Sequence, residues 1–311
     1  MEMQAKIDLS VNIGGCTLKN PVITASGTFG YGREFVDFMD IERLGAIAVK
    51  GLTMQPRPGN KPPRLVETPS GLINAIGLEN VGIKKFIEVK APYLKQLDTK
   101  IIANISGFSP EEYAGMTELL CEAEAADLIE ANLSCPNIKH GGIAFGSDPK
   151  MMADITAELK RRSAVPVIVK LSPNVTDIAM MARVAEENGA DAVSLVNTFL
   201  ALAIDVEQRR PVLGNVTGGL SGPAIRPIAV RMTWQVAQAV SIPVMGMGGI
   251  ATARDALEFL IAGACCVAPG TACFVNPAAP VEVLEGIEDY MRRHNMTRLD
   301  ELIGSLSVES D

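Results

Sequence analysis

The chain has 311 residues, of which 48% are hydrophobic and 21% are charged. This apolar content is too high for a disordered protein, and a chain of this length can bury a large core without disulfides or a structural metal. The formal net charge of −8 argues against nucleic acid or an anionic membrane as the main partner, so an anionic ligand needs a local cluster of donors.

The N-terminal ten residues mix charged and polar side chains and lack the apolar core of a signal peptide. No uncharged apolar run reaches the ~20 residues that a membrane span needs. The six cysteines include no Cys-x-x-Cys pair, so neither a structural zinc nor an iron–sulfur cluster is expected in this chain. We therefore expect a cytoplasmic protein with no membrane or nucleic-acid partner and no metal site of its own.

Eight short runs rich in apolar and β-branched residues recur along the chain, separated by stretches with helical spacing. Such strands, alternating with helices, are typical of a parallel sheet that is buried on both faces. The predicted strands are 21–26, 46–53, 100–106, 127–135, 166–173, 192–198, 243–250 and 265–271. This α/β pattern predicts a (β/α)8 TIM barrel. A doubly wound sheet is disfavoured because no Gly-x-Gly-x-x-Gly turn follows an early strand.

We expect residues 1–311 to form a single domain with a short β extension at the N-terminus. Residues 55–78 and 137–149 are rich in Gly, Pro and Asn and follow the second and fourth strands, so they predict loops over the C-terminal face of the barrel. Thr252 with Asp255 three residues later predicts the start of a helix, and Gly263 predicts its end.

Polar residues concentrate at the carboxyl ends of five predicted strands, which converge on one pocket in a barrel. A single Asn there could equally be a satisfied core residue, but Lys is almost never fully buried unless it is paired. The set predicts a site for an anionic ligand that forms many hydrogen bonds. Its members are Lys50, Asn104, Ser106, Asn132, Cys135, Lys170, Asn197 and Thr198.

Glycines follow the last two predicted strands, in Gly246-Met247-Gly248-Gly249-Ile250 and Pro269-Gly270-Thr271. Glycine lets backbone N–H groups approach a ligand closely, and the helix after Gly249 offers its positive N-terminal end. Barrels frequently bind phosphate between these two loops. A phosphorylated cofactor or substrate is therefore predicted.

Cys135 ends the fourth predicted strand between polar neighbours and precedes a proline. Most single cysteines are inert apolar residues, so this alternative stays open. A free thiol has a pKa of ~8.5, and a nearby cation would make it a usable base or nucleophile. His140 is a second candidate base in the following loop.

The segment Asn132-Leu133-Ser134-Cys135-Pro136-Asn137 resembles the catalytic-loop signature of the class 1 dihydroorotate dehydrogenases. Two further segments are similar to the catalytic subunit of the NAD-linked type 1B branch. They are Lys139-His140-Gly141-Gly142 and Val216-Thr217-Gly218-Gly219-Leu220-Ser221-Gly222. The resemblance extends from Leu9 to about Tyr290. A mild departure is Val196 before Asn197, where isoleucine is common.

The resemblance implies a barrel that binds one FMN per chain and oxidises (S)-dihydroorotate to orotate in de novo synthesis of UMP. It implies that Cys135 is the general base at C5, while a hydride passes from C6 to flavin N5. The FMN contacts that it implies are Ser26, Lys50, Gly51, Asn104, Asn132, Lys170, Val196, Gly222, Gly248, Gly249, Gly270 and Thr271. The substrate contacts are Lys50, Asn74, Ala75, Ile76, Gly77, Leu78, Asn132, Asn197 and Thr198, with Asn137 as a further candidate.

The resemblance also implies a partner, an electron-transfer subunit that carries FAD and a 2Fe–2S cluster and reduces NAD⁺. We accordingly expect a heterotetramer of two catalytic and two electron-transfer chains. The nearest alternative is a type 1A homodimer that uses fumarate. More distant alternatives are a non-redox phosphate-binding barrel with a Schiff-base lysine, and a barrel that serves only as a scaffold.

Overall fold

The computed structural model describes residues 7–133 and 146–308. Seven parallel strands form the barrel wall, and most of their residues are buried, since one face of each strand fills the barrel and the other contacts helices. In hydrogen-bonded order they are β15 (Cys266–Ala268), β14 (Val244–Met247), β9 (Ala192–Leu195), β8 (Val167–Lys170), β7 (Leu128–Asn132), β6 (Lys100–Ile105) and β3 (Ala46–Ala48).

An eighth extended segment closes the ring between β3 and β15. Val22 bridges in parallel to Val267 of β15, and Ile23 bridges to Ala46 of β3. The Ile23 N–H donates to the Val267 carbonyl at 3.0 Å, and the Gly45 N–H donates to the Val22 carbonyl at 2.9 Å. The predicted (β/α)8 barrel is confirmed, and all eight predicted strand segments contribute to its wall.

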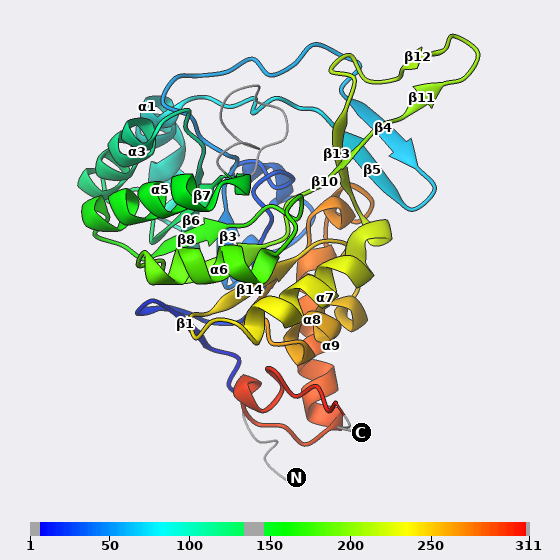
Figure 1. Cartoon of the computed structure of the whole chain (residues 1–311). Helices are drawn as coiled ribbons and strands as arrows, with labels where there is room; N and C mark the ends of the chain where they lie inside the picture. The colour runs from blue at the N-terminus through cyan, green and yellow to red at the C-terminus, as the bar shows by residue number, and fades with distance from the viewer. Residues whose placement is uncertain (1–6, 134–145, 309–311) are drawn as a thin grey trace.

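Helices surround the wall and cover the outward faces of the strands (Figure 1). The Thr252 and Asp255 side chains form the predicted capping box at the start of α8, and each satisfies a free N–H group of the other. The α-helices are α1 (Ile83–Lys85), α2 (Ala91–Leu94), α3 (Pro110–Glu122), α5 (Pro149–Arg162), α6 (Ile178–Glu187), α7 (Arg226–Ala237), α8 (Ala253–Ile261) and α9 (Ala279–Arg293). A π-helical turn, η3 (Phe86–Lys90), joins α1 to α2, and short 3-10 turns are η1 (Arg33–Phe35), η2 (Ile41–Arg43), η4 (Pro223–Ile225), η5 (Thr271–Phe274) and η6 (Leu299–Glu301).

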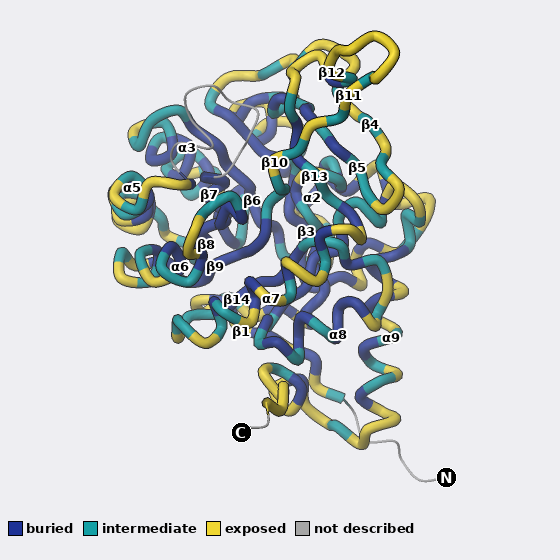
Figure 2. Tube along the Cα trace, turned by 45° about the vertical axis from the view of Figure 1, so that its right-hand side comes forward, coloured by how far each residue is buried: buried dark blue, intermediate teal, exposed yellow. Residues whose placement is uncertain are grey.

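The barrel strands and the inner faces of the helices form one contiguous apolar core. Figure 2 shows the strands in the colour of buried residues, whereas exposed positions lie on the outer helix surfaces and loops. A second, small core contains Ile73, Ala75 and Leu213. It lies under a separate sheet and not in the barrel.

This second sheet is antiparallel, and it lies beside the C-terminal ends of the barrel strands (Figure 1). Residues 55–78, predicted as a loop, contribute two of its strands, because Val66 and Ile73 pair across a hairpin and pack on the small core. The order is β10 (Phe199–Ala201), β13 (Gly218–Ser221), β5 (Gly71–Asn74) and β4 (Leu65–Thr68). A two-stranded hairpin extends beyond it, formed by β11 (Ile204–Asp205) and β12 (Arg210–Pro211).

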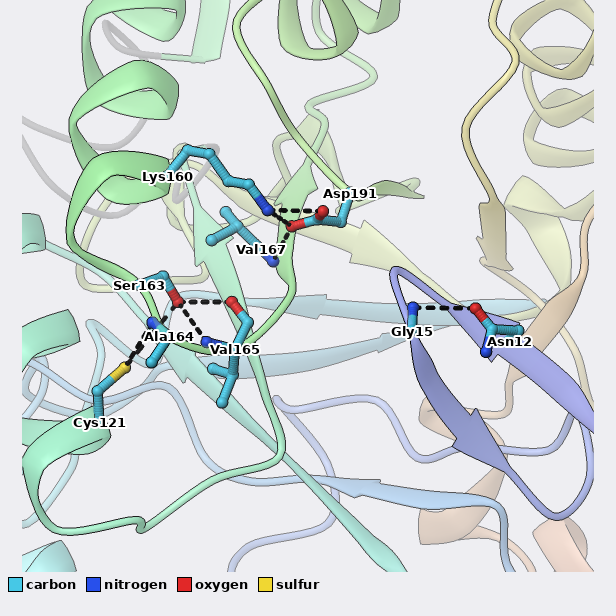
Figure 3. Close-up of polar contacts among 9 residues, drawn as sticks. All are labelled: Asn12, Gly15, Cys121, Lys160, Ser163, Ala164, Val165, Val167 and Asp191. Carbon is cyan, nitrogen blue, oxygen red and sulfur yellow. Dashed lines mark hydrogen bonds and ion pairs between the residues drawn. The ribbon is translucent and has the colours of Figure 1, made fainter.

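The expected β extension at the N-terminus is a hairpin of β1 (Val11–Ile13) and β2 (Cys16–Leu18), on the N-terminal side of the barrel. Its turn passes close to the start of β9: a Cβ on Gly14 would lie 2.7 Å from Cβ of Asp191. Asn12 Oδ1 accepts a hydrogen bond of 2.9 Å from the Gly15 N–H and holds the turn (Figure 3).

Polar contacts on the same side fix the connection from α5 to β8 (Figure 3). Asp191 accepts hydrogen bonds from Lys160 Nζ at 2.5 and 2.6 Å and from the Val167 N–H at 2.8 Å. Ser163 Oγ donates to the Val165 carbonyl at 2.6 Å, and Cys121 Sγ accepts from the Ala164 N–H at 3.4 Å. These groups stabilise the barrel at the end that lies away from the predicted site.

Within residues 7–133 and 146–308, none of the helices combines the length and apolar character required to cross a bilayer. The same residues contain no cluster of three or more His, Cys, Asp or Glu side chains arranged to hold a metal ion.

Candidate active site

A cavity of about 390 Å³ opens at the C-terminal ends of the barrel strands, and it lies within the ~300–1,000 Å³ typical of ligand sites. Its wall combines strand ends, the loops that follow them and the second sheet. The lining residues are Ala25, Ser26, Gly27, Thr28, Gly30, Lys50, Gly51, Leu65, Leu72, Asn74, Ile76, Gly77, Leu78, Asn104, Asn132, Lys170, Val196, Asn197, Thr198, Ser221, Gly222, Ile225, Met247, Gly248, Gly249, Ala268, Gly270, Thr271 and Phe274.

The structure brings together in this wall every predicted cofactor and substrate residue that it describes, except Ala75. Ala75 is fully buried in the small core with Ile73 and Leu213. Ser106 is buried behind the wall, where its Oγ donates to the Asn132 carbonyl at 3.4 Å. The predicted base Cys135 and its neighbours Asn137, Lys139, His140, Gly141 and Gly142 lie outside the described residues.

Sequence reasoning missed two groups of wall residues. One group follows the first strand and includes Gly27 and Thr28. The available signal was their position after a predicted strand, because strand ends in a barrel converge on the cavity. The other is apolar and comes from separate elements, namely Leu65, Leu72, Ile225 and Phe274. No local motif marks these residues, because only the tertiary fold brings them to the cavity.

Lys50 presents an ammonium group to the cavity with no ion-pair partner among the described residues. Its backbone is fixed by a hydrogen bond of 2.8 Å from its N–H to the Gly30 carbonyl. Burial lowers the pKa of the Lys50 side chain below its ordinary value. The nearby Arg64 and Glu79 neutralise each other at 2.5 Å. An anionic ligand would therefore gain an unshared positive charge at Lys50.

Three amide side chains lie around the cavity, two at the ends of barrel strands and one in the second sheet. Asn197 Nδ2 donates to Asn132 Oδ1 at 3.3 Å, and Asn197 Oδ1 accepts from the Thr198 N–H at 2.9 Å. Asn74 Nδ2 donates to the Gly219 carbonyl of β13 at 3.1 Å. Asparagine offers both donors and an acceptor, so this arrangement suits a ring edge with alternating N–H and C=O groups.

Glycines form the wall where phosphate was predicted. Gly222, Gly248 and Gly249 have φ values of 95°, 124° and 81°, which side chains rarely tolerate. A Cβ on Gly249 would lie 2.7 Å from the Arg226 Cβ and 2.8 Å from the Gly222 carbonyl oxygen. Only glycine fits at these positions, and the cavity wall there is backbone without side chains, as a phosphate site requires. We term these three glycines with Gly270 the glycine cradle.

A buried polar cluster stands behind the opposite part of the wall. Lys170 Nζ lies 3.6 Å from Glu130 Oε2, and both side chains are less than a tenth exposed. Asn104 Nδ2 donates to Glu130 Oε2 at 2.5 Å. Asn104 Oδ1 is buried and has no hydrogen-bond partner among the described residues. Because an unpaired buried acceptor is costly, this oxygen marks a position for a ligand N–H.

The thiols that the structure describes near the barrel core are poor candidates for a base at neutral pH. Burial raises the pKa of Cys273 to about 12. A hydrogen bond with Cys265, together with burial, raises the pKa of Cys266 well above its ordinary value. Cys266 is buried in the apolar core and Cys265 packs against it, so both act as small core residues.

The profile of the dihydroorotate dehydrogenase family matches residues 8–291, which include every described residue of the cavity wall. The chain belongs to the dihydroorotate dehydrogenase family. Three relatives carry the name "Dihydroorotate dehydrogenase B (NAD(+)), catalytic subunit". They come from Lachnoclostridium phytofermentans (56% identical over 298 residues), Bacteroides fragilis (53% over 301) and Pelobacter propionicus (52% over 301). Each alignment covers 96–97% of this chain and 99% of the relative.

Proposed function

We propose that this chain catalyses the FMN-dependent oxidation of (S)-dihydroorotate to orotate, a step in de novo synthesis of UMP. The observation that carries the proposal is one cavity that combines a glycine cradle, a Lys50 ammonium that no described carboxylate pairs with, and amide groups suited to a pyrimidine ring. Family membership and the names of close relatives support the same reaction.

The cavity wall fits FMN in three respects. The glycine cradle suits a phosphate group, the Asn104 Oδ1 acceptor suits a ring N–H, and Lys170 suits negative charge on a reduced ring. When bound, FMN supplies at N5 the acceptor for the hydride that leaves C6 of dihydroorotate. The residues that would hold it are Ser26, Lys50, Gly51, Asn104, Asn132, Lys170, Val196, Gly222, Gly248, Gly249, Gly270 and Thr271.

The substrate would bind against the polar side of the wall. Lys50 would attract its carboxylate, and Asn132, Asn197 and Thr198 would bind the ring edge. The segment that contains Asn74 supplies the remaining contacts, Ile76, Gly77 and Leu78, which line the cavity beside it. Ala75 would support this segment from the small core.

The proposed general base is Cys135, which lies three residues beyond Asn132 in the sequence. A proton on a carbon next to a carbonyl is acidic enough for a tuned thiolate to remove, provided that donors stabilise the developing enolate. Cys135 would take the proton from C5. Asn132 and Asn197 would hold the ring so that this proton faces the thiolate.

Electrons would leave through a partner subunit that carries FAD and a 2Fe–2S cluster and reduces NAD⁺, in a heterotetramer with two chains of each kind. The printed names of the relatives support a partner, because each is a "catalytic subunit" of an NAD(+) enzyme. The sequence of this chain supports it as well, since no Gly-x-Gly-x-x-Gly turn follows an early strand.

The test is a visible spectrum of the purified chain, recorded before and after anaerobic addition of dihydroorotate. We expect a flavin band that bleaches rapidly. A flavin band that dihydroorotate leaves unchanged would contradict the proposed substrate, and no flavin band after adding FMN would contradict the cofactor. The Cys135→Ala variant should keep the flavin band and bleach at least ~100-fold more slowly, as expected for loss of a general base.

A further inference from the structure

Glu130 is a buried carboxylate behind the cavity wall, and none of the roles above uses it. It lies on β7, is 2% exposed and does not line the cavity. Both carboxylate oxygens have partners: Oε1 accepts from Ser194 Oγ at 2.6 Å, while Oε2 accepts from Asn104 Nδ2 at 2.5 Å and faces Lys170 Nζ at 3.6 Å. A charge this deeply buried is costly unless its partners are held in place.

The strand register explains how these four residues meet. Asn104 of β6 is the direct partner of Glu130 of β7, and Lys170 of β8 is the direct partner of Ser194 of β9. The cluster thus spans four adjacent strands of the rigid wall. Two of its members, Asn104 and Lys170, reach the cavity, while Glu130 and Ser194 remain behind it.

The contact with Glu130 decides which end of the Asn104 amide faces the cavity. A carboxylate accepts hydrogen bonds and donates none, so it binds the NH2 group and leaves Oδ1 on the other side. Gly51 leaves the space beside this oxygen free of a side chain, because a Cβ there would lie 2.9 Å from it. The cavity therefore presents an acceptor, and not a donor, at this point.

We propose that Glu130 is a positioning residue that fixes the Asn104 amide and anchors the Lys170 ammonium, so that the wall offers the flavin ring an acceptor and a cation at fixed places. The inference rests on the proposed function, since it takes FMN as the ligand. Glu130 acts only through its two neighbours and does not itself contact the cofactor or substrate.

The test inverts the hydrogen bond between positions 104 and 130. In Asn104→Asp, two carboxylates face each other and repel. In the Asn104→Asp/Glu130→Gln double variant, the amide introduced at position 130 donates to the carboxylate introduced at position 104, whose second oxygen remains an acceptor in the cavity. The double variant also keeps one carboxylate and one amide in the cluster, so the size of the side chains and the net charge are both conserved.

The readout is the dissociation constant of FMN, measured by flavin fluorescence on each purified chain, independently of turnover. We expect Asn104→Asp to weaken binding at least ~30-fold, as a lost charge-assisted hydrogen bond predicts, and Glu130→Gln to weaken it ~10-fold. The double variant should recover to within ~5-fold of wild type, because the inverted pair restores the contact.

Ser194→Ala is the matched control, since it removes the contact to Oε1 and leaves the one to Asn104 intact. It should change FMN affinity less than ~3-fold, because the contacts of Glu130 with Asn104 and Lys170 both remain. If FMN binding in the double variant is weakened by the product of the two single-variant factors, the inference is overturned and Glu130 only supports the fold.

Folding gives a second way to decide. Where Asn104→Asp does not fold, as judged by circular dichroism, a folded double variant that binds FMN still demonstrates the rescue, and a double variant that also fails to fold overturns it. A wild-type chain that binds FMN but is not bleached by dihydroorotate would contradict the proposed substrate alone and leave this test valid.

Discussion

At the scale of single residues, Lys50 offers a test based on charge. Burial lowers its pKa, so without a ligand it loses its proton at a pH below the ordinary lysine value of 10.5. An orotate carboxylate favours the protonated form and would raise this pKa again. Orotate affinity should therefore fall as the pH rises through the lowered pKa, with uptake of a proton on binding.

The measurement is the dissociation constant of orotate from the flavin difference spectrum across the alkaline range. Lys50→Gln should bind ~10–100-fold more weakly at neutral pH and lose this component of the pH dependence. Lys84→Gln, at an exposed lysine on α1, is the control and should match wild type. A pH dependence that persists unchanged in Lys50→Gln would assign it to another group.

The sequence placed individual polar residues well because chain order alone determines which side chains lie at strand ends in a barrel. Lys50, Asn104, Asn132 and Lys170 all line the cavity for this reason. Glu130 was missed, although a carboxylate within an apolar strand was a visible signal. Its partners lie on three other strands, so its role emerges only from the register between them.

At the scale of elements, the N-terminus of α8 is fixed by a motif readable in the sequence. Thr252 Oγ1 accepts from the Asp255 N–H, and Asp255 Oδ2 accepts from the Thr252 N–H at 2.8 Å. Thr252→Ala should lower the free energy of unfolding by about 1 kcal/mol and the melting temperature by about 2 °C. Thr252→Ser keeps the hydroxyl, so its melting temperature should fall by only a fraction of that amount. A fall in Thr252→Ser as large as in Thr252→Ala would contradict a capping role.

The second sheet could not be predicted in this way. Its strands come from residues 65–74 and 199–221, and their pairing depends on contacts between positions 145 residues apart, such as that of Asn74 with Gly219. The β4 strand is largely exposed, so its sequence resembles a loop more than a buried strand. Glycine-rich β13 gives no strand signal, yet glycine is required there because a Cβ on Gly218 would lie 2.6 Å from the Asn74 carbonyl oxygen.

At the scale of the whole molecule, barrel closure joins residues 22–23 to both β3 and β15, although β15 lies near the other end of the chain. Closure brings the loops after the first and last strands together, so that Ser26 and Thr271 line the same cavity. This arrangement was predictable because eight strand segments in a parallel sheet have one common closed solution. The sequence did not predict that isolated bridges at Val22 and Ile23, and not a full strand ladder, complete the ring.

The whole molecule is expected to work as part of a larger complex. The described residues line a cavity that we propose for flavin and substrate, and the sequence lacks the glycine-rich turn that holds a dinucleotide after an early strand. The isolated chain should therefore be reduced by dihydroorotate at full speed but reduce NAD⁺ far more slowly than the complex with its electron-transfer subunit.

The decisive comparison is steady-state turnover with NAD⁺ and with fumarate, for the isolated chain and for the complex. Rapid NAD⁺ reduction only in the complex would support the heterotetramer, since the second subunit supplies the missing path for electrons. Equal NAD⁺ rates would exclude the need for a partner. Rapid turnover of the isolated chain with fumarate would favour the type 1A homodimer.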